Sequence, residues 1–454
     1  MSQVSQVADN FKKVFGKLNQ VLFADFQFQK EIPFQESAKV GEAYIECFPM
    51  TFEGGITYAG TGLEAYDINP AIAGTVKQST ITPSQTVLTS VIPWAVMSRS
   101  AGGGEKAFFD ATKHILQNHI KSHNKFLEIA RIYGQSTLGL GTLSYATATY
   151  RGVALTAGAG TFTLANSETL TFATGGVATT MNASAPTGAL GAILFAPGQF
   201  APQIWSGMEG VRIKEIATAA PTVIVKSGKI LGLDSDNGFI YVDFVPTVAS
   251  AANSHKIVFE GWEDSKECVG MQKILSNIGL LFGINASQYS LWRSSVLNLG
   301  SKRFNLVAVQ KGIAMAVNRG GLDKPLTIFV APNTFAGMSK DDAALRNMDA
   351  SYSKNSESGF ESISYFAANG KNTIRSNPML KDGEAFGLVL EDWFRSGSTE
   401  ITNTIPGLDQ QIIFPLENQT GWAFRSFSDQ YIICRRPSNQ VYWYGIDNDG
   451  VAFA

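Results

Sequence analysis

Apolar residues recur at the spacing of a helix over one long stretch of the chain, residues 105–133. The apolar positions that follow the 3.6-residue period are Phe108, Ala111, Ile115, Leu116, Ile120, Phe126, Leu127, Ala130 and Tyr133. Lysines fall mostly between them, and Gly134 predicts the end of the helix. At 1.5 Å per residue this helix would be about 45 Å long, so we expect it to cross a whole domain as a strut.

The chain before this helix changes from helical to β-type spacing near residue 40. Apolar clusters within residues 1–40 predict an amphipathic helix followed by an extended arm. Between residues 41 and 100, apolar and polar residues alternate, with turn residues such as Glu53, Gly54 and Gly55 between them. The middle of this stretch has few residues that could form a core of its own. We therefore expect a long two-stranded loop.

A β-rich stretch follows the long helix. Thr, Ala, Gly and Val dominate residues 135–200, where the only charged side chains are Arg151 and Glu168. Alternating Thr and Val are typical of strands joined by short turns. Asp236, Asn237 and Gly238 lie between two apolar runs and predict a hairpin. These patterns predict a β-rich module that extends to about residue 262.

The remainder of the chain mixes helical and strand patterns. Residues 271–282 predict one helix, and residues 340–348 predict another with Ser339 as its cap. The run LTIFV before Pro332 predicts a buried strand. Further strands are predicted within residues 361–370, 385–394, 411–417, 422–436 and 441–446. Helices mixed with strands in no regular alternation indicate the α+β class.

Composition and charge narrow the class of protein. Hydrophobic residues make up 44% of the chain and charged residues 16%, which is typical of wide, weakly charged contact surfaces. The net charge of -2, without clustered Lys and Arg, argues against tight nucleic-acid binding. We expect no membrane segment and no secretion signal, and hence a protein kept in a cytoplasm. Cys47, Cys268 and Cys434 are widely spaced and odd in number, so we expect buried reduced thiols.

Several groups of residues resemble metal-binding motifs but lack an essential member. His114, His119 and His123 lie on the long helix, and the last two have the i, i+4 spacing of zinc sites. No glutamate stands between them and no third ligand is close in sequence, so we expect packing or hydrogen bonding instead. Asp234 and Asp236 begin like a calcium loop, but the twelfth position is Val245 rather than Glu.

Signatures of catalysis are also incomplete. The glycine-rich runs at 102–104 and 317–321 lack the lysine of a phosphate loop and are interpreted as hinges, and residues 447–450 as a turn. No Ser, His and Asp grouping or nucleophile elbow is found. Lys77 is interpreted as a solvated lysine, without a cross-link. We predict no catalytic, cofactor-binding or metal-binding residues, no cofactor, and no enzymatic activity.

The order of these elements resembles the major capsid proteins of tailed bacteriophages. Two runs carry the resemblance more specifically. The run VGMQKILSNIGLLFGINASQYSLWRSSV, residues 269–296, is similar to a family segment in which a short helix precedes Gly-Ile, a Tyr and a Trp-Arg pair. The run at 359–400 is similar to a later series of strand, turn and strand. The resemblance implies a Hong Kong 97-like fold with an N-terminal arm, an extended β loop, a long spine helix, a β-rich insertion and an axial domain.

The same resemblance implies a division of the chain into domains. In this family the axial domain gathers around symmetry axes, and the extended loop lies over a neighbouring subunit. The implied parts are an N-terminal arm (1–40), the extended loop (41–100), the spine helix of a peripheral domain (101–136), a β-rich inserted module (137–262), the axial domain (263–415) and C-terminal strands that return to the peripheral domain (416–454). The inserted module is larger than the minimal family pattern.

The function implied by the resemblance is that of a major capsid protein. It would assemble with copies of itself, as hexamers and pentamers, into an icosahedral shell around the double-stranded DNA of a tailed phage. The expected partners are scaffolding, portal and decoration proteins, with non-specific enclosure of DNA and no membrane. The expected location is the virion capsid, after assembly in the host cytoplasm.

Physical reasoning agrees with this interpretation. A long loop and an N-terminal arm with few apolar contacts of their own are costly to order unless a partner covers them. Three other interpretations stay open at this point. The arm and loop could be simple flexible segments, or the chain could be an encapsulin-like shell protein of a cellular nanocompartment. The Thr-rich and Gly-rich stretch would also suit a β-rich bacterial surface protein.

Overall fold

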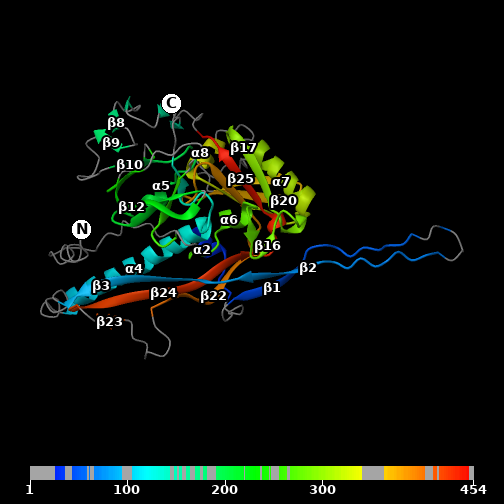
Figure 1. Cartoon of the computed structure of the whole chain (residues 1–454), viewed down its shortest axis with the longest axis horizontal. Coiled ribbons are helices and arrows are strands. Elements are labelled where there is room, and N and C mark those ends of the chain that lie inside the picture. The colour runs from blue at the N-terminus through cyan, green and yellow to red at the C-terminus, as the bar shows by residue number, and fades with distance from the viewer. Residues whose placement is uncertain are drawn as a thin grey trace, which may run out of the picture.

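The fold is described from a computed structural model of the chain, with two six-stranded sheets in its body, one long helix and one long projecting hairpin (Figure 1). The residues that the structure describes are 26–35, 43–58, 61, 66–94, 105–143, 148–150, 153–155, 160–163, 169–173, 177–180, 191–218, 220–235, 238–244, 246, 255–262, 266–339, 362–403, 413–416 and 419–448. The predicted helices within residues 1–25 and 340–348 therefore lie outside the described residues, as does the run at 102–104.

The long helix α4 (Glu105–Tyr133) has the bounds that its apolar spacing predicts. It ends directly before Gly134, as predicted, and a side chain at position 134 would collide with the carbonyl oxygen of Cys268. Figure 1 shows α4 running beside a ribbon of long strands. In this ribbon β24 (Gly421–Cys434) pairs with β3 (Ser84–Pro93) on one side and with β22 (Trp393–Thr402) and β23 (Ile413–Pro415) on the other.

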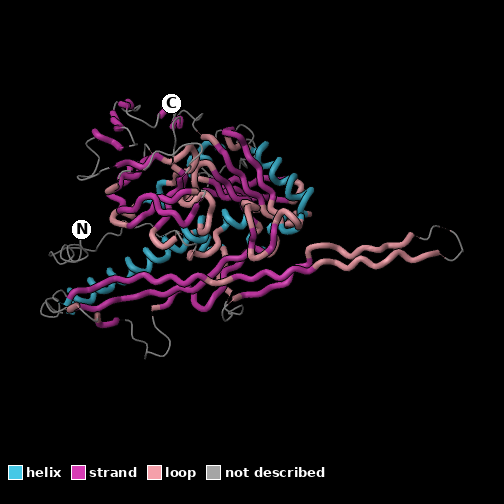
Figure 2. The backbone as a smooth tube through the Cα atoms, in the orientation of Figure 1, coloured by secondary structure: helices cyan, strands magenta, loops and turns pink. Residues whose placement is uncertain are grey.

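A hairpin projects from the body next to this ribbon. Its base is the antiparallel pair β1 (Tyr44–Pro49) and β2 (Val76–Ile81). Two arms continue beyond the base, and Figure 2 shows them extending side by side away from the rest of the chain. The β-type prediction is confirmed, but the turn predicted near Gly54 is wrong. Gly54 lies within one arm and forms a bridge with Ile72 of the other.

The predicted β-rich module is built on an antiparallel sheet of six strands. In spatial order they are β10 (Gly191–Leu194), β13 (Phe239–Val242), β12 (Ala220–Asp234), β11 (Arg212–Ala217), β14 (His255–Phe259) and β4 (Gly141–Thr142). The hairpin predicted near residue 237 is confirmed by the pairing of β12 with β13. Helix α5 (Pro202–Trp205) adds the buried Trp205 to the core. Smaller sheets contain β5 (Ala148–Tyr150), β6 (Val153–Leu155), β7 (Gly160–Thr163), β8 (Thr169–Ala173) and β9 (Val177–Thr180).

A second six-stranded sheet contains both parallel and antiparallel pairs. In spatial order it consists of β17 (Ser295–Lys302), β25 (Val441–Ile446), β21 (Glu384–Leu388), β18 (Thr327–Val330), β20 (Gly370–Ser376) and β19 (Ser362–Ala367). Helix α7 (Leu306–Gly320) packs on it, where the Trp443 indole donates a hydrogen bond to the Ala308 carbonyl at 3.0 Å. The strands predicted in the C-terminal half are all present.

Two local expectations in this half are wrong. Helix α6 (Met271–Leu275) is shorter than predicted, because Asn277 has a left-handed backbone with φ 58° and its side chain bonds to Ser294 instead. Strands β15 (Leu280–Leu281) and β16 (Ile284–Asn285) follow. The run at 317–321 is a helix end rather than a hinge, since Gly321 caps α7 in a left-handed conformation with φ 64°.

Short elements complete the described chain. They are α2 (Gln27–Glu31), α8 (Pro332–Ser339) and the 3-10 turns η2 (Ser290–Trp292), η3 (Leu390–Asp392) and η4 (Pro437–Asn439). Ser339, predicted as the cap of a following helix, is the last residue of α8. No helix in the described part of the chain is both long enough and apolar enough to cross a membrane. Taken together, these elements confirm the predicted α+β class.

Candidate assembly surface

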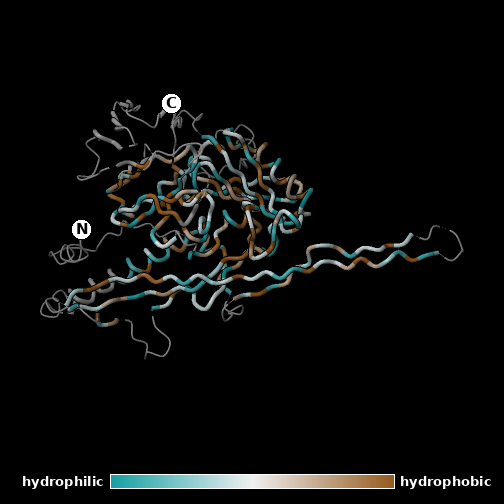
Figure 3. Tube along the Cα trace, viewed as in Figure 1, coloured by the Kyte–Doolittle hydropathy of each residue, from teal (hydrophilic) through white to brown (hydrophobic). Residues whose placement is uncertain are grey.

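The projecting hairpin, residues 43–58 and 66–81, exposes large apolar side chains along its whole length. Phe52 is 89% exposed, Tyr58 88% and Ile68 81%, measured against the residues that the structure describes. The other exposed large apolar side chains of the hairpin are Ile45, Ile56, Tyr66, Ile72 and Val76. Figure 3 shows hydrophobic and hydrophilic positions interspersed along both arms. A two-stranded hairpin cannot bury both of its faces by itself, so the surface of the projecting hairpin is suited to contact with another molecule.

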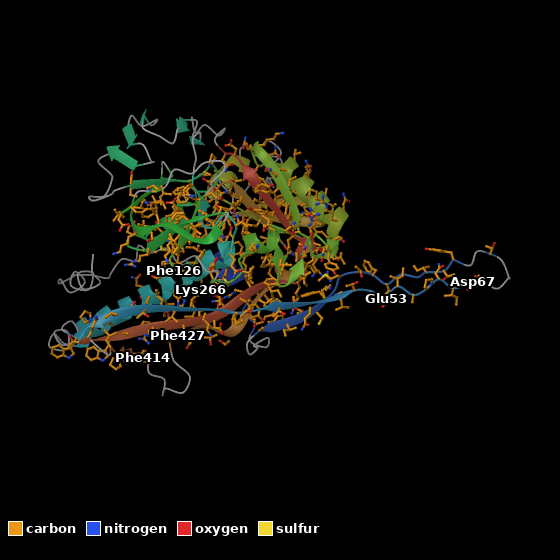
Figure 4. All side chains as sticks on the ribbon, viewed as in Figure 1. Glu53, Asp67, Phe126, Lys266, Phe414 and Phe427 are labelled. Atoms are coloured by element: carbon orange, nitrogen blue, oxygen red, sulfur yellow. The ribbon has the colours of Figure 1, made fainter. Side chains whose placement is uncertain are left out.

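The charge of the projecting hairpin has a single sign beyond its base. Between Met50 and Val76 the sequence has three acidic residues and no Lys or Arg. Two of the three, Glu53 and Asp67, are exposed on the arms, as Figure 4 shows. The surface therefore combines apolar side chains with a weak negative charge.

The base of the hairpin is fixed to the body by aromatic and backbone contacts. The rings of Phe48 and Trp292 lie 4.8 Å apart between centroids, and Trp292 is fully buried. The Thr80 amide donates to the Phe282 carbonyl at 3.2 Å, which ties β2 to the loop after α6. Arg435 forms an ion pair with Glu46 at 3.3 Å. These contacts set the direction in which the arms leave the body.

Within the arms, the hydrogen bonds join one arm to the other. The Met50 amide donates to the Thr75 carbonyl at 2.7 Å, and the Gly54 amide donates to the Ile72 carbonyl at 2.8 Å. Further out, the Asn69 side chain donates to the Ile56 carbonyl at 2.9 Å. The arms thus hold each other in an extended shape while their side chains stay available to a partner.

Residues 26–35, expected as part of an extended arm, pack into the body. Phe28 and Ile32 are fully buried, and the Phe28 amide donates to the Glu128 carboxylate of α4 at 2.8 Å. Arg395 of β22 donates to the carbonyls of Ile32 at 2.8 Å and Gln29 at 3.1 Å. This segment is therefore fastened to both the long helix and the ribbon.

A buried polar network links the same region internally. Arg131 of α4 donates to Glu128 at 3.1 Å and to Gln430 of β24 at 3.0 Å. Arg395 donates to the same Gln430 oxygen at 3.2 Å and to Glu400 at 2.7 Å. Burial lowers the pKa of Arg395 to about 10, with a further contribution from the positive charge of Arg131. Since the partners of both arginines are specific, the network fixes α4 against β22 and β24 in one arrangement.

A second buried network lies at the junction of α4, the β-rich module and the second sheet. The Lys381 ammonium donates to the Gly139 carbonyl at 2.9 Å, and its backbone amide donates to the Tyr133 hydroxyl at 2.9 Å. Gln272 donates to both Glu384 and Tyr442. Burial lowers the pKa of Lys381 to about 8 and raises the pKa of Glu384. These contacts join three parts of the body.

His119 and His123 have a hydrogen-bonding role between α4 and the ribbon, as expected from the sequence. Both imidazoles contact the hydroxyl of Ser426 on β24, at 2.8 and 2.7 Å respectively. The side chain of His114 lies outside the described residues. Among the described residues, no group of three or more His, Cys, Asp and Glu side chains is placed to hold a metal ion.

The cysteines differ from the expectation at one position. Cys268 and Cys434 are buried, and burial raises the pKa of the Cys268 thiol to about 12. Cys47 is exposed, because it lies at an outward position of β1 in the base of the hairpin. All three thiols are free.

Other positions singled out in the sequence have no shared site. The Lys77 ammonium lies 6.0 Å from the centroid of the Tyr289 ring. Asp234 is the last residue of β12, and Asp236 and Val245 lie outside the described residues. The end of the predicted turn at 447–450 also lies outside them.

Sequence reasoning missed the buried polar residues of β24. Ser426, Ser428 and Gln430 are buried although they alternate with larger neighbours like the solvent-facing side of a strand. The available signal was the long helix itself, because its histidines and Arg131 need polar partners if they face inward. The alternation identifies two faces of β24 but does not identify which one α4 covers.

Comparisons with known proteins concern the fold. No protein-family model matches the sequence, and no curated protein matches it. A chain of the Cyanophage A-1(L) capsid asymmetric unit is 10% identical and has a TM-score of 0.52, covering 96% of this chain and 96% of that chain. A chain of the native GTA particle capsid is 7% identical with a TM-score of 0.46 and 98% coverage of both chains. A chain from Mycobacterium phage Bobi is 9% identical with a TM-score of 0.41 and 98% coverage of both chains.

The cyanophage likeness covers nearly the whole of both chains. At 10% identity it concerns the fold. The chain therefore has an α+β fold similar to that of the cyanophage capsid chain, in agreement with the fold that the order of its elements predicts.

Proposed function

We propose that the chain is the major capsid protein of a tailed bacteriophage, and that many copies assemble into an icosahedral shell around the double-stranded DNA genome. The observation that carries the proposal is the projecting hairpin with its exposed apolar side chains. The fold shared with the cyanophage capsid chain supports it. Both observations favour a repeating subunit whose contacts lie with copies of itself.

The arms of the hairpin are costly to order in a single chain. Fixing the backbone costs about 1–2 kcal/mol per residue, and the arms have no core that could compensate for this. Burying a large apolar side chain contributes about 1.5–3 kcal/mol, and Phe52, Tyr58 and Ile68 are all available for such burial. A second copy that covers the hairpin would supply the missing contacts.

The geometry of the hairpin favours closed rings. We propose that the hairpin lies on a different surface of the next copy, which makes the contact between copies head-to-tail; such contacts close into rings when the rotation allows. We propose rings of six and five subunits as the units of the shell. The rigid body that the two buried networks create would keep the angle between successive copies constant.

We also propose the domain roles that the resemblance implies. These are an N-terminal arm (1–40), an extended loop (41–100), the spine helix of a peripheral domain (101–136), a β-rich inserted module (137–262), an axial domain (263–415) and C-terminal strands (416–454). Support for the spine comes from α4, which spans the body beside the ribbon. The last of these parts contains both β24 and β25. The two strands lie in different sheets, since β24 belongs to the ribbon beside α4 and β25 to the second sheet.

The proposed partners follow from the shell. They are scaffolding and portal proteins during assembly in the host cytoplasm, and a decoration protein on the finished virion. Contact with DNA would be non-specific enclosure, in keeping with a net charge of -2. We propose a structural rather than enzymatic role. Among the described titratable groups, His119, His123 and Lys381 form hydrogen bonds within the body.

Electron microscopy of the full-length chain tests the proposal. We expect closed shells or ring-shaped capsomers, alone or with the phage's scaffolding protein. A chain that stays monomeric in every buffer, even with that partner, would contradict it. The cargo separates the phage shell from an encapsulin-like compartment, since packaged DNA supports the first and an enclosed enzyme the second. The size of the β-rich module favours the phage shell.

A further inference from the structure

The two histidines of α4 belong to a continuous chain of polar contacts that joins the helix to the ribbon. His119 Nδ1 lies 2.6 Å from Ser90 Oγ, and its Nε2 lies 2.8 Å from Ser426 Oγ. His123 Nδ1 lies 2.7 Å from the same Ser426 oxygen, and its Nε2 lies 3.0 Å from Thr86 Oγ1. All four ring nitrogens are therefore used, and one hydroxyl is shared between the two imidazoles.

This contact differs from the one that holds the C-terminal part of α4. Within residues 117–126 the buried positions are the two histidines, and His119 also packs edge-on against the Phe424 ring at 4.7 Å. Residues 127–133 are all buried, with Leu127, Ile129 and Ile132 in the apolar core. Residues 117–126 thus contact the ribbon through the two buried histidines, whereas residues 127–133 combine apolar packing with the buried bonds of Glu128 and Arg131.

Counting protons shows what the polar contact requires. With both imidazoles neutral, each ring has one donor and one acceptor, and donation runs in one direction along the chain, either from Ser90 through Ser426 to Thr86 or the reverse, according to the tautomers. One added proton can still be accommodated when a terminal hydroxyl turns or the bonds on the other ring reverse. With two added protons both rings donate to Ser426, its own hydrogen has no acceptor left in the chain, and two positive charges face one oxygen.

The charged groups around the histidines do not compensate such charges. Arg131, on the same helix, adds positive charge and is bound to Glu128. From the loop before α6, Glu267 and Cys268 line a cavity of about 60 Å³ beside His123, and Glu267 accepts a hydrogen bond from the Gln135 amide at 2.8 Å. The sequence of β3 has no titratable residue.

On β24, the two charged residues within residues 421–430 are engaged elsewhere. Arg425 lies over the Phe414 ring, with 5.8 Å from its guanidinium carbon to the ring centroid. Asp429 accepts a hydrogen bond from Ser398 at 2.5 Å. Neither of these two charged residues is therefore paired with the imidazoles.

We propose that protonation of His119 and His123 opens the contact between residues 117–126 of α4 and the β3–β24 ribbon. We call this contact the joint. Residues 117–126 stay on the ribbon while both imidazoles are neutral, and they separate from it when both are protonated. Residues 127–133 stay anchored by their apolar packing and by the bond from Arg131 to Gln430 of β24. Acid therefore releases residues 117–126 from the ribbon without unfolding the body. The inference concerns the single chain and does not rest on the proposed shell.

The direction of the pH dependence follows from burial. Burial lowers the pKa of His123 from 6.5 to about 4, with His119 and Arg131 adding to the effect, and burial also lowers the pKa of His119. A histidine whose pKa is lowered by the contact favours the closed joint above pH 6.5, its ordinary pKa. This preference is lost as the pH falls from 6.5 toward 4.

Hydrogen exchange of the unassembled full-length chain tests the joint. We expect exchange of residues 117–126, corrected for the intrinsic effect of pH, to rise about tenfold or more between pH 7 and pH 5. Residues 127–133 should change much less. In the double variant His119→Gln and His123→Gln, whose side chains do not titrate, the rise should be absent. The matched control His255→Gln removes a histidine bound to Glu215 in the β-rich module and should keep the rise.

Two outcomes would overturn the proposal: equal acid responses in the wild type and the double variant, or no acid response in the wild type. If the double variant does not fold, the wild type still decides. The chain has four histidines, so their imidazole signals can be titrated by nuclear magnetic resonance. Two of them should titrate below pH 6.5 together with the opening of residues 117–126. Titration of all four near pH 6.5, without opening, would contradict the joint.

Discussion

The ring of Phe48 packs at 4.8 Å and an interplanar angle of 48° against the ring of Trp292, and this pair joins the base of the projecting hairpin to the body. Trp292 is fully buried and its indole donates to the Leu281 carbonyl at 3.4 Å. The direction of the hairpin therefore depends on a fixed aromatic partner. The arms beyond it have their apolar side chains exposed. This contrast leads to the first prediction.

Replacing Phe48 by Ala should destabilise the isolated chain, whereas replacing Phe52 by Ala should not. We expect Phe48→Ala to lower the free energy of unfolding by about 2 kcal/mol, from the lost aromatic pair and partial burial. Phe52 is 89% exposed, so Phe52→Ala should stay within about 0.5 kcal/mol. Urea unfolding of the unassembled variants measures both. Equal stability of the two would contradict the described role of Phe48.

The outer arms should matter for assembly and not for folding. The double variant Tyr58→Ser and Ile68→Ser removes two highly exposed apolar side chains. We expect an unchanged unfolding midpoint but a loss of shells in sedimentation and electron microscopy. Val223→Ser, at another exposed apolar position in the β-rich module, serves as the control and should assemble normally. Normal shell yield from the double variant would count against the hairpin as the contact between copies.

The buried network around Arg395 should be sensitive to truncation. Arg395→Ala removes the side-chain donor to the carbonyls of residues 29 and 32, and one of the donors to Gln430 and to Glu400. Removing one member of such a buried charged network typically costs about 3–5 kcal/mol. Arg212→Ala, in an exposed ion pair with Glu260 at 3.5 Å, should cost less than about 1 kcal/mol. Thermal or urea unfolding compares them, and a loss below that of Arg212→Ala would refute the network's role.

Stability should fall in acid partly because of the two histidines. The contribution of His123 is present above pH 6.5 and decreases toward pH 4, since its pKa is lowered from 6.5 to about 4. A shift of this size corresponds to about 3 kcal/mol. Urea unfolding at pH 7.5 and 4.5 should show a smaller acid loss in the variant His119→Gln and His123→Gln than in the wild type. An identical loss in both would contradict this contribution.

One thiol should react in the native chain and three after denaturation. Cys47 is exposed, whereas Cys268 and Cys434 are buried, and the pKa of Cys268 is raised to about 12. Labelling with a thiol reagent at pH 8 should therefore modify Cys47 first, and Cys47→Ser should abolish the fast phase. Rapid labelling of a second cysteine in the folded chain would show that a buried strand or loop opens readily.

Much of the fold could be predicted because the strongest patterns were local. The bounds of α4 follow from its helical spacing and from Gly134, and the projecting hairpin follows from β-type runs around a stretch that forms no core of its own. The six-stranded sheet around β12 was predicted only as a group of strands. Its order depends on contacts between distant segments such as β4 and β14, which local spacing does not contain.

The remaining differences have specific physical causes. Residues 26–35 look like an arm in the sequence, but Glu128 and Arg395 supply bonds to their backbone that the sequence does not reveal. The helix predicted over 271–282 ends early because Asn277 prefers its side-chain bonds to Ser294 over helical continuation. In β24, which side of the strand is covered depends on the position of α4, and Ser426 could not be linked to the histidines beforehand.

Strand β2 of the hairpin continues after only Thr82 and Pro83 into β3 of the ribbon, which pairs with β24 along its entire length. A force that pulls on the outer ends of the arms would thus act parallel to β3 and β24. The hydrogen bonds between these two strands would then resist together instead of opening one by one. Internal pressure on a closed container produces tension of this kind between its parts. The segment from β2 to β3 would then transmit this tension from one subunit of the proposed shell into the body of the next.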